Sequence, residues 1–297
     1  MNPREQGFLL LTSHLGNPER RVLTPNQLKT LGQRMRSWGP PHEDRDLTPQ
    51  DLRRLGFGEE LAVRIVALLE EDDLLEYYLA RAKRLDCQPI TRLNPLYPAI
   101  LLQRLGQEAP GCLWVRGDPN LLNAPAISLV GSRDPKPENR TFARAVGFQA
   151  AKQGLALVSG NARGSDREAQ DTCLAAGGKV ISIVADELIR QPDRNGVLYV
   201  SEEDYDDPFS APRALSRNRC IHALGRMVFV SQCGNGKGGT WDGTLKNLRM
   251  GWSPVACFDD GSPAARQLEE MGAFLIGNEV LNDLKNLSQP DRELFDP

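Results

Sequence analysis

The sequence predicts an α/β fold: a mostly parallel sheet flanked by helices, with a helical module at the N-terminus. Beyond residue 122, short apolar segments alternate with helical segments of about a dozen residues, which is the pattern of βαβ units. Residues 1 to about 85 instead carry apolar residues at helical spacing. The chain has 297 residues, 40% of them hydrophobic and 25% charged, so its composition is that of a globular protein.

Thr-Pro pairs begin both helical stretches of the N-terminal module, over residues 23–39 and 47–85. Proline is favoured in the first turn of a helix, so each pair marks a helix start. In the second stretch, Gly56 and Gly58 separate two short apolar segments, which predicts the tight turn of a helix-hairpin-helix. Such a turn either offers backbone N–H groups to a phosphate or only packs a helical hairpin. The acidic residues that follow favour packing.

The remaining segments follow in chain order. Residues 86–122 are rich in prolines and turns and are expected to connect the two regions. Strands are predicted over 126–130, 155–160, 179–185, 197–202, 227–233, 254–260 and 273–276, and helices over 138–154, 165–178, 215–225, 240–251 and 262–272. Ser165 and Glu168 form an S-x-x-E capping box, which predicts the start of the second of these helices. The expected divisions are a helical module over 1–85, an α/β domain over 86–285 and a short tail over 286–297.

Charge is distributed unevenly, although the formal net charge is only −3. No acidic residue lies between Pro208 and Trp241, whereas five basic residues do: Arg213, Arg217, Arg219, Arg226 and Lys237. Phosphate binding depends on a local concentration of Lys and Arg. A positive face is therefore compatible with a mildly acidic chain.

Cysteine and histidine usage argues against a disulfide framework and a metal site. The six cysteines are scattered without a C-x-x-C pair, and the three histidines lie far apart in the sequence. No stretch of 18 apolar residues and no signal-peptide pattern occurs. We therefore expect a cytoplasmic protein with no metal, no cofactor and no membrane contact.

Three glycine-containing loops follow predicted strands, at residues 131–135, 159–166 and 234–240, and each carries one cation: Arg133, Arg163 or Lys237. Ligands of parallel α/β sheets bind beyond the carboxyl ends of the strands. Glycines let the backbone approach a ligand, and N–H groups at the following helix start favour an anion. The loops predict a phosphate-binding edge; the alternative is that the glycines only serve tight turns.

Further candidates lie in the basic segment. Arg217 and Arg219, at the start of a predicted helix with Asn218 between them, either clamp a phosphate bidentately or form a solvated face. Three aromatic residues near the loops are candidates to stack a base, although a core position is the commoner role for each: Phe142, Phe209 and Trp241.

Catalytic motifs are missing from the sequence. It has no G-x-S-x-G elbow, no Walker motif and no complete G-x-G-x-x-G series. Four carboxylates lie near the loops, and capping explains three of them: Asp134, Asp166, Glu168 and Asp242. We predict a binding protein without catalytic residues.

Four segments, 96–118, 127–133, 157–170 and 216–230, resemble the DprA/Smf family of DNA-processing proteins in order and spacing. The resemblance spans roughly residues 45 to 280. It implies an extended Rossmann-like fold with a SAM-like helical module, binding of single-stranded DNA, and loading of a RecA-type recombinase during natural transformation. A RecA-type recombinase and a second copy of the chain are thus candidate partners, to which no residues can be assigned.

The resemblance also implies DNA-phosphate contacts at Ser132 and Arg133, in the loop from Ser159 to Gly164, and at Arg217 to Arg219. Together with the loop analysis, the expected set is Gly131, Ser132, Arg133, Ser159, Gly160, Asn161, Arg163, Gly164, Arg217, Asn218, Arg219, Lys237, Gly238, Gly239 and Thr240.

The chain also departs from the family pattern. Ser165 and Gln170 replace an isoleucine and a histidine, the loop "GNGKGGTWDGT" replaces "GSLxTA", and residues 286–297 are too few for the winged helix of many members. "GKGGTWDG" is similar to a motif of the phosphoribohydrolases of the same clan, but Gly243 occupies the position of the catalytic glutamate. Two alternatives to DNA binding therefore stay open: a nucleotide or nucleotide-sugar sensor or phosphoribohydrolase-like enzyme, and a scaffold whose site has decayed.

Overall fold

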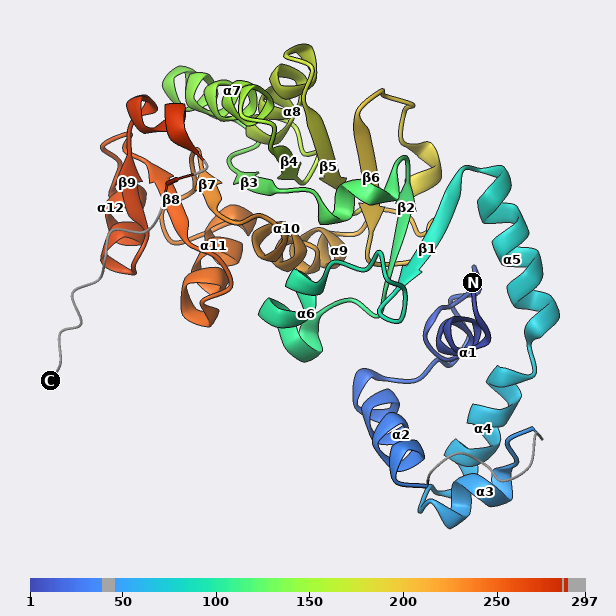
Figure 1. The fold of residues 1–297 in the computed structure, drawn as a ribbon. Helices are drawn as coiled ribbons and strands as arrows, with labels where there is room; N and C mark the ends of the chain where they lie inside the picture. The colour runs from blue at the N-terminus through green and yellow to red at the C-terminus, as the bar shows by residue number, and fades with distance from the viewer. Residues whose placement is uncertain (39–45, 285, 288–297) are drawn as a thin grey trace, which may run out of the picture.

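The computed structural model describes residues 1–38, 46–284 and 286–287 (Figure 1). Most of the tail expected over 286–297 lies outside these residues. The described helices are α1 (Pro3–Thr12), α2 (Pro25–Trp38), α3 (Pro49–Arg54), α4 (Glu59–Leu69), α5 (Asp72–Arg84), α6 (Ala99–Leu105), α7 (Pro137–Lys152), α8 (Ser165–Ala175), α9 (Ala211–Ser216), α10 (Asn218–Leu224), α11 (Gly239–Met250) and α12 (Pro263–Glu270). The strands are β1 (Cys87–Thr91), β2 (Cys112–Arg116), β3 (Ala126–Val130), β4 (Ala156–Ser159), β5 (Lys179–Ile183), β6 (Val197–Ser201), β7 (Val228–Val230), β8 (Val255–Phe258) and β9 (Phe274–Ile276).

The strands form one sheet in the order β1-β2-β6-β5-β4-β3-β7-β8-β9. All pairs from β6 to β9 are parallel, and only β1 with β2 and β2 with β6 are antiparallel. The predicted α/β fold with a mostly parallel sheet is confirmed. From β3 the chain builds the sheet in one direction to β6 and then returns to add β7 on the other side. Strand order therefore reverses between β3 and β7, where ligands of such sheets bind.

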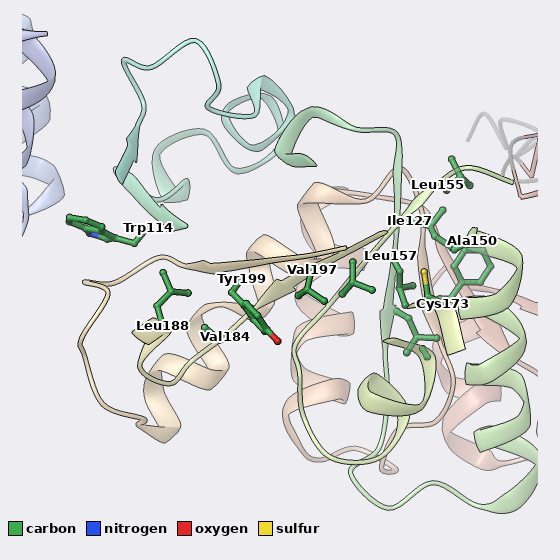
Figure 2. Close-up of a cluster of buried hydrophobic side chains, with 14 of the residues drawn as sticks. Trp114, Ile127, Ala150, Leu155, Leu157, Cys173, Val184, Leu188, Val197 and Tyr199 are labelled. Carbon is green, nitrogen blue, oxygen red and sulfur yellow. The ribbon is translucent and has the colours of Figure 1, made fainter. Parts of the chain in front are cut away.

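Helices cover both faces of the sheet because the parallel strands are apolar on both sides. In β3, Ile127 and Leu129 contribute to a core with α7 and α8, whereas Ala126 and Val130 contribute to a second core with α6, α10, α11 and α12. Figure 2 shows the first core as a row of side chains from Ile127 and Leu155 to Trp114.

Residues 86–122, expected to be a connection, contain two strands of the sheet. β1 pairs antiparallel with β2, and β2 with β6. The sequence pattern does not reveal them because the segment is rich in prolines and turns, and because Pro89 interrupts the strand pattern of β1.

The N-terminal helices extend the first core. Leu9 and Leu10 of α1 and Tyr78 of α5 belong to the same apolar cluster as Trp114 of β2. The Tyr78 ring stacks on Tyr205 with centroids 4.5 Å apart and meets Trp114 edge-on at 5.6 Å. The Tyr78 hydroxyl donates a 2.6 Å hydrogen bond to Asp206. Side chains from the N-terminal helices and from the sheet region thus pack into one interior.

Helices α2, α3 and α4 surround a smaller core that includes Leu52 and Ile65. The predicted hairpin is confirmed: Gly56, with φ +85°, turns the chain between α3 and α4. The first turn of α4 carries Glu59 and Glu60, and Arg53 pairs with Glu59 at 2.7 Å. Acidic side chains at this helix start disfavour a phosphate, which supports packing as the role of the turn.

Across the part of the chain that the structure describes, no helix is both long enough and apolar enough to span a membrane.

Candidate nucleic-acid interface

Two clefts open at the carboxyl edge of the parallel strands. The first, of about 550 Å³, lies among the loop after β3, helices α9 and α10, and the start of α11; we call it the α11 cleft. The second, of about 490 Å³, is lined by the loop after β4, residues 184–186 and Arg167 of α8; we call it the α8 cleft. Both are lined by Arg133, Ala162, Phe209 and Arg217, so the two clefts adjoin.

The three predicted loops meet at this edge. A Cβ on Gly131 would lie 2.1 Å from Ser231 Oγ and 2.4 Å from Ser165 Oγ, so only glycine fits between the loops after β4 and β7. The Ser231 hydroxyl donates to Ser165 Oγ at 2.8 Å, and Thr240 Oγ1 donates to the Gly131 carbonyl at 2.9 Å. Convergence of the loops is confirmed.

The loop after β4 is held by Asp166, whose carboxylate accepts hydrogen bonds from the N–H groups of Gly160 (3.0 Å) and Ala162 (3.3 Å). Those two donors are therefore occupied and not offered to a ligand. Burial raises the pKa of Asp166, and the positive charge of Arg217 opposes that rise.

The predicted capping box is wrong. Gly164 occupies the N-cap with φ +87°, and no side chain caps the helix. Ser165 is the first helical residue, and Glu168 pairs with Arg144 (2.7 Å) and Arg140 (3.3 Å) instead. Because glycine adopts this backbone conformation without strain, Gly164 takes the N-cap position and the helix begins one residue earlier than the box requires.

Arg217 is the central cation of the edge. It lies at a break between α9 and α10, where one continuous helix over 215–225 was predicted. Its guanidinium covers Gly160: a Cβ there would be 1.6 Å from Nη1. The residue is only 7% exposed, and Nε and Nη1 have no hydrogen-bond partner among the described residues. Burial lowers the pKa of Arg217, whereas the charge of Asp166 raises it. A buried cation with unpaired donors is costly, and an anion would offset that cost.

Further cations lie around Arg217. Arg133 and Arg163 are exposed on the rim of the α8 cleft, with Arg167 beside them, and Lys237 is exposed on the α11 cleft. Within the described residues, none of these four side chains forms an ion pair. Asp186 is the acidic residue that lines the α8 cleft. The edge therefore presents several uncompensated positive charges.

Two predicted site residues do not join the others. Arg219 points away, donating to the Glu108 carbonyl at 2.8 Å and pairing with Glu202 at 2.9 Å. The predicted bidentate clamp of Arg217 and Arg219 is wrong, because residues two apart on a helix do not face the same side. Ser159 is fully buried, and its hydroxyl accepts a 2.7 Å hydrogen bond from Gln170.

The other predicted site residues lie along the two clefts. Asn218 lines the α11 cleft and donates to the Gly239 carbonyl at 3.2 Å. The cleft linings also contain Gly131, Ser132, Arg133, Gly160, Asn161, Arg163, Lys237, Gly238, Gly239 and Thr240. Gly164 packs beneath them: a Cβ there would lie 2.5 Å from the carbonyl oxygens of Ser132 and Arg133.

Phe209 is the exposed aromatic residue of the site. It is 55% exposed and lines both clefts, whereas Trp241 and Phe142 are buried in the core. A core position is the expected role of all three from the sequence, and Phe209 departs from it. The signal for Phe209 was its place directly before Ser210, which caps α9 and so marks Phe209 as a loop residue.

The described residues contain no group of three or more His, Cys, Asp or Glu side chains that could hold a metal ion. His222 lines the α11 cleft but is 1% exposed, and burial lowers its pKa to about 3, so the imidazole is neutral at physiological pH. The arrangement is suited to binding anions beside an aromatic ring.

The chain is similar to known DNA-processing proteins. A family model for DNA recombination-mediator protein A matches residues 88–285, about two thirds of the chain. The chain is 25% identical over 192 residues to Protein Smf of Synechocystis sp., an alignment that covers 60% of this chain and 47% of that protein. It is 27% identical over 193 residues to the DNA processing protein DprA of Streptococcus pneumoniae, covering 60% and 68%. The chain thus spans about half the length of the first of these relatives.

Solved structures share the fold. The structure of DprA from Streptococcus pneumoniae has a TM-score of 0.72 and 21% identity, covering 97% of this chain and 99% of that one. DNA processing protein A from Helicobacter pylori, whose structure concerns its single-stranded DNA binding mode, has a TM-score of 0.55 and 21% identity, covering 67% and 95%.

Proposed function

Because the chain belongs to the DNA recombination-mediator protein A family, which matches the greater part of its α/β region, we propose that it binds single-stranded DNA at the carboxyl edge of its sheet. The observation that carries the proposal is the buried guanidinium of Arg217, whose Nε and Nη1 lack partners in the described chain while the side chain lines both clefts. A backbone phosphate provides oxygens and negative charge for such a group.

The surrounding residues support contact with more than one nucleotide. Arg133 and Arg163 offer exposed, unpaired charges on the same rim. Phe209 stands between the clefts with an exposed ring, and base stacking on an aromatic ring is independent of sequence. The site combines a cationic groove with a stacking platform, which is the combination that binds single strands.

In this proposal the protein acts in the cytoplasm as an accessory of recombination during natural transformation, loading a RecA-type recombinase onto the strand. A recombinase and a second copy of the chain are its partners. Residues 86–285 bind the DNA, while residues 1–85 form the helical module packed against them.

The test is a titration with a fluorescent oligonucleotide at several salt concentrations, using Arg133→Ala/Arg163→Ala. If each arginine contacts one phosphate, the slope of log affinity against log salt falls by about 1.4, because a single strand contributes about 0.7 per phosphate. The matched control is Arg84→Ala/Arg249→Ala, which removes the same charge from exposed positions outside both clefts. Equal affinity and slope for wild type and Arg133→Ala/Arg163→Ala would overturn the proposal.

A second variant tests stacking. Phe209→Ala is expected to weaken oligonucleotide binding by about 1–3 kcal/mol, the range for one stacked base, and to leave the salt slope unchanged. Because the Phe209 side chain is 55% exposed, the urea unfolding midpoint of Phe209→Ala should match that of the wild-type protein. Phe148→Ala, which truncates a 41% exposed phenylalanine outside both clefts, is the control. Equal DNA affinity of the two variants would exclude a stacking role.

A further inference from the structure

The α11 cleft contains a helix start that has no role in the DNA binding proposed above. Helix α11 begins at Gly239, and its N-cap is Gly238 with φ +97° and no capping side chain. The first backbone bond of the helix runs from the Asp242 N–H to the Gly238 carbonyl. The N–H groups of Gly239, Thr240 and Trp241 therefore have no acceptor within the described residues.

This helix start lines the α11 cleft. Gly238, Gly239 and Thr240 line the α11 cleft, and the positive end of a helix of 12 residues favours negative charge. Asp242, the acidic residue in the first turn of α11, is exposed and is not among the residues that line the cleft.

An independent observation in the same cleft is Arg217, which is 93% buried, lacks partners at Nε and Nη1 in the described chain, and shares the lining with Gly239. Lys237 adds an exposed ammonium from the loop ahead of α11. The acid in the lining is Asp166, whose carboxylate is engaged by two backbone N–H groups. Positive charge therefore exceeds negative charge at this end.

Apart from Arg133, on the rim shared with the α8 cleft, the remaining lining of the α11 cleft is uncharged and largely apolar. Leu215, which is 54% exposed, and the buried Ile221 line this cleft, and Phe209 lines both it and the α8 cleft. His222 is neutral, and its two ring nitrogens lack hydrogen-bond partners among the described residues. A Cβ on Gly243 would be 3.2 Å from His222 Nε2, so a glycine there lets α11 close tightly on the histidine.

A cleft with a cationic end and an apolar end matches a nucleotide, whose phosphate is charged and whose base is flat. Its volume of about 550 Å³ lies in the range of small-molecule sites. A phosphate monoester carries a charge of about −1.5 to −2 at neutral pH, more than the single charge of a phosphate inside a DNA strand. The additional donors at the start of α11 suit that extra charge.

We propose that the α11 cleft binds a terminal nucleoside phosphate, with the phosphomonoester at the start of α11 between Lys237 and Arg217, and the base against Leu215 and Phe209. The ligand is a free nucleotide or the phosphorylated end of a DNA strand. The second source rests on the DNA binding proposed above, and the first does not.

Calorimetry with deoxyadenosine 5′-monophosphate and with deoxyadenosine tests the site directly. The nucleotide should bind wild type and the nucleoside should not. Lys237→Glu is expected to weaken nucleotide binding by about tenfold or more, because it places an acid beside the phosphate. Lys179→Glu makes the same charge change at an exposed position at the start of β5, on the opposite edge of the sheet, and should change affinity by less than about twofold. Circular dichroism melts of both variants establish that they are folded.

A second arm uses one oligonucleotide with a 5′-phosphate, a 3′-phosphate or neither. If the ligand is a strand end, one phosphorylated form binds wild type about tenfold more tightly than the unmodified form, and Lys237→Glu abolishes the difference. If the ligand is a free nucleotide, the monophosphate binds and the three oligonucleotides bind alike. Absence of monophosphate binding together with equal binding of the three oligonucleotides would overturn the inference. Failure of every oligonucleotide to bind would instead refute the DNA proposal and leave the calorimetric result to decide this one.

Discussion

Substituting Gly160 by alanine tests whether this glycine exists to make room for Arg217. Among positions in the clefts it is unusual, because its φ is not in the left-handed region and its backbone conformation is open to any residue. The obstacle is the guanidinium alone: an alanine Cβ would lie 1.6 Å from Nη1, 2.4 Å from Cζ and 2.5 Å from Nη2 of Arg217. Carbon contacts require about 3.5 Å, so the guanidinium must retreat by roughly 2 Å.

The magnitude follows from that displacement. Forcing a methyl group into a packed site costs about 1–3 kcal/mol. We therefore expect Gly160→Ala to lower the free energy of unfolding by about 1–3 kcal/mol relative to wild type. A charged hydrogen bond to phosphate is worth about 1.5–3 kcal/mol, so loss of the Arg217 contact should weaken oligonucleotide binding by about tenfold to a hundredfold.

A double-mutant cycle with Arg217→Ala isolates the interaction. Without the guanidinium, the alanine methyl at position 160 has space, so the double variant should be more stable than the sum of the single effects predicts, by about 0.5–3 kcal/mol. The measurements are urea unfolding curves and oligonucleotide titrations of the four proteins. Additive unfolding free energies, or wild-type DNA affinity for Gly160→Ala, would refute the reasoning.

Two further predictions concern the junction of the N-terminal helices with the sheet. Burial raises the pKa of Asp204, so the folded chain holds a proton that the unfolded chain has lost, and stability falls as the pH rises from about 4 through the raised pKa. Both hydrogen-bond donors to Asp204, one of them Trp114 Nε1, bond the same carboxylate oxygen, so Asp204→Asn keeps both hydrogen bonds. The variant should flatten the decline of the urea unfolding midpoint between pH 4 and 7. Parallel curves of midpoint against pH for the variant and the wild type would contradict this. Tyr78→Phe removes the 2.6 Å bond to Asp206 and should lower the free energy of unfolding by about 1.5–3 kcal/mol. Tyr77→Phe, at a 64% exposed neighbour, should have no effect beyond about 0.5 kcal/mol, and a similar loss in both variants would deny the bond a role.

The fold could be predicted where each element carries its own pattern. Strands β3 to β9 and the helices between them follow local periodicity, and parallel strands joined by helices have few arrangements. Strands β1 and β2 escaped prediction because the segment that contains them is rich in prolines and turns, with Pro89 inside β1 itself. The break at Arg217 escaped because Arg217 keeps a right-handed helical conformation, with φ −63° and ψ −18°, and no glycine or proline marks the position.

The site could be predicted as a set of loops but not as a set of side-chain directions. The carboxyl ends of parallel strands fall on one edge, so Arg133, Arg163 and Lys237 could be grouped from the sequence. Whether a side chain faces that edge depends on helix phase and on partners elsewhere. Arg219 turns to Glu202 for this reason, and no local pattern contains that contact.

The shared interior of the N-terminal helices and the sheet has a consequence for cooperativity. Because Tyr78 packs between Trp114 and Tyr205, separating the chain at residue 85 would uncover two large aromatic side chains that are buried in the intact protein. The first 85 residues are therefore not an independently folding domain that could be exchanged between proteins. Helices α1 and α5 should melt together with the sheet in a single transition, while α2, α3 and α4, which enclose a core of their own, are the part able to open first.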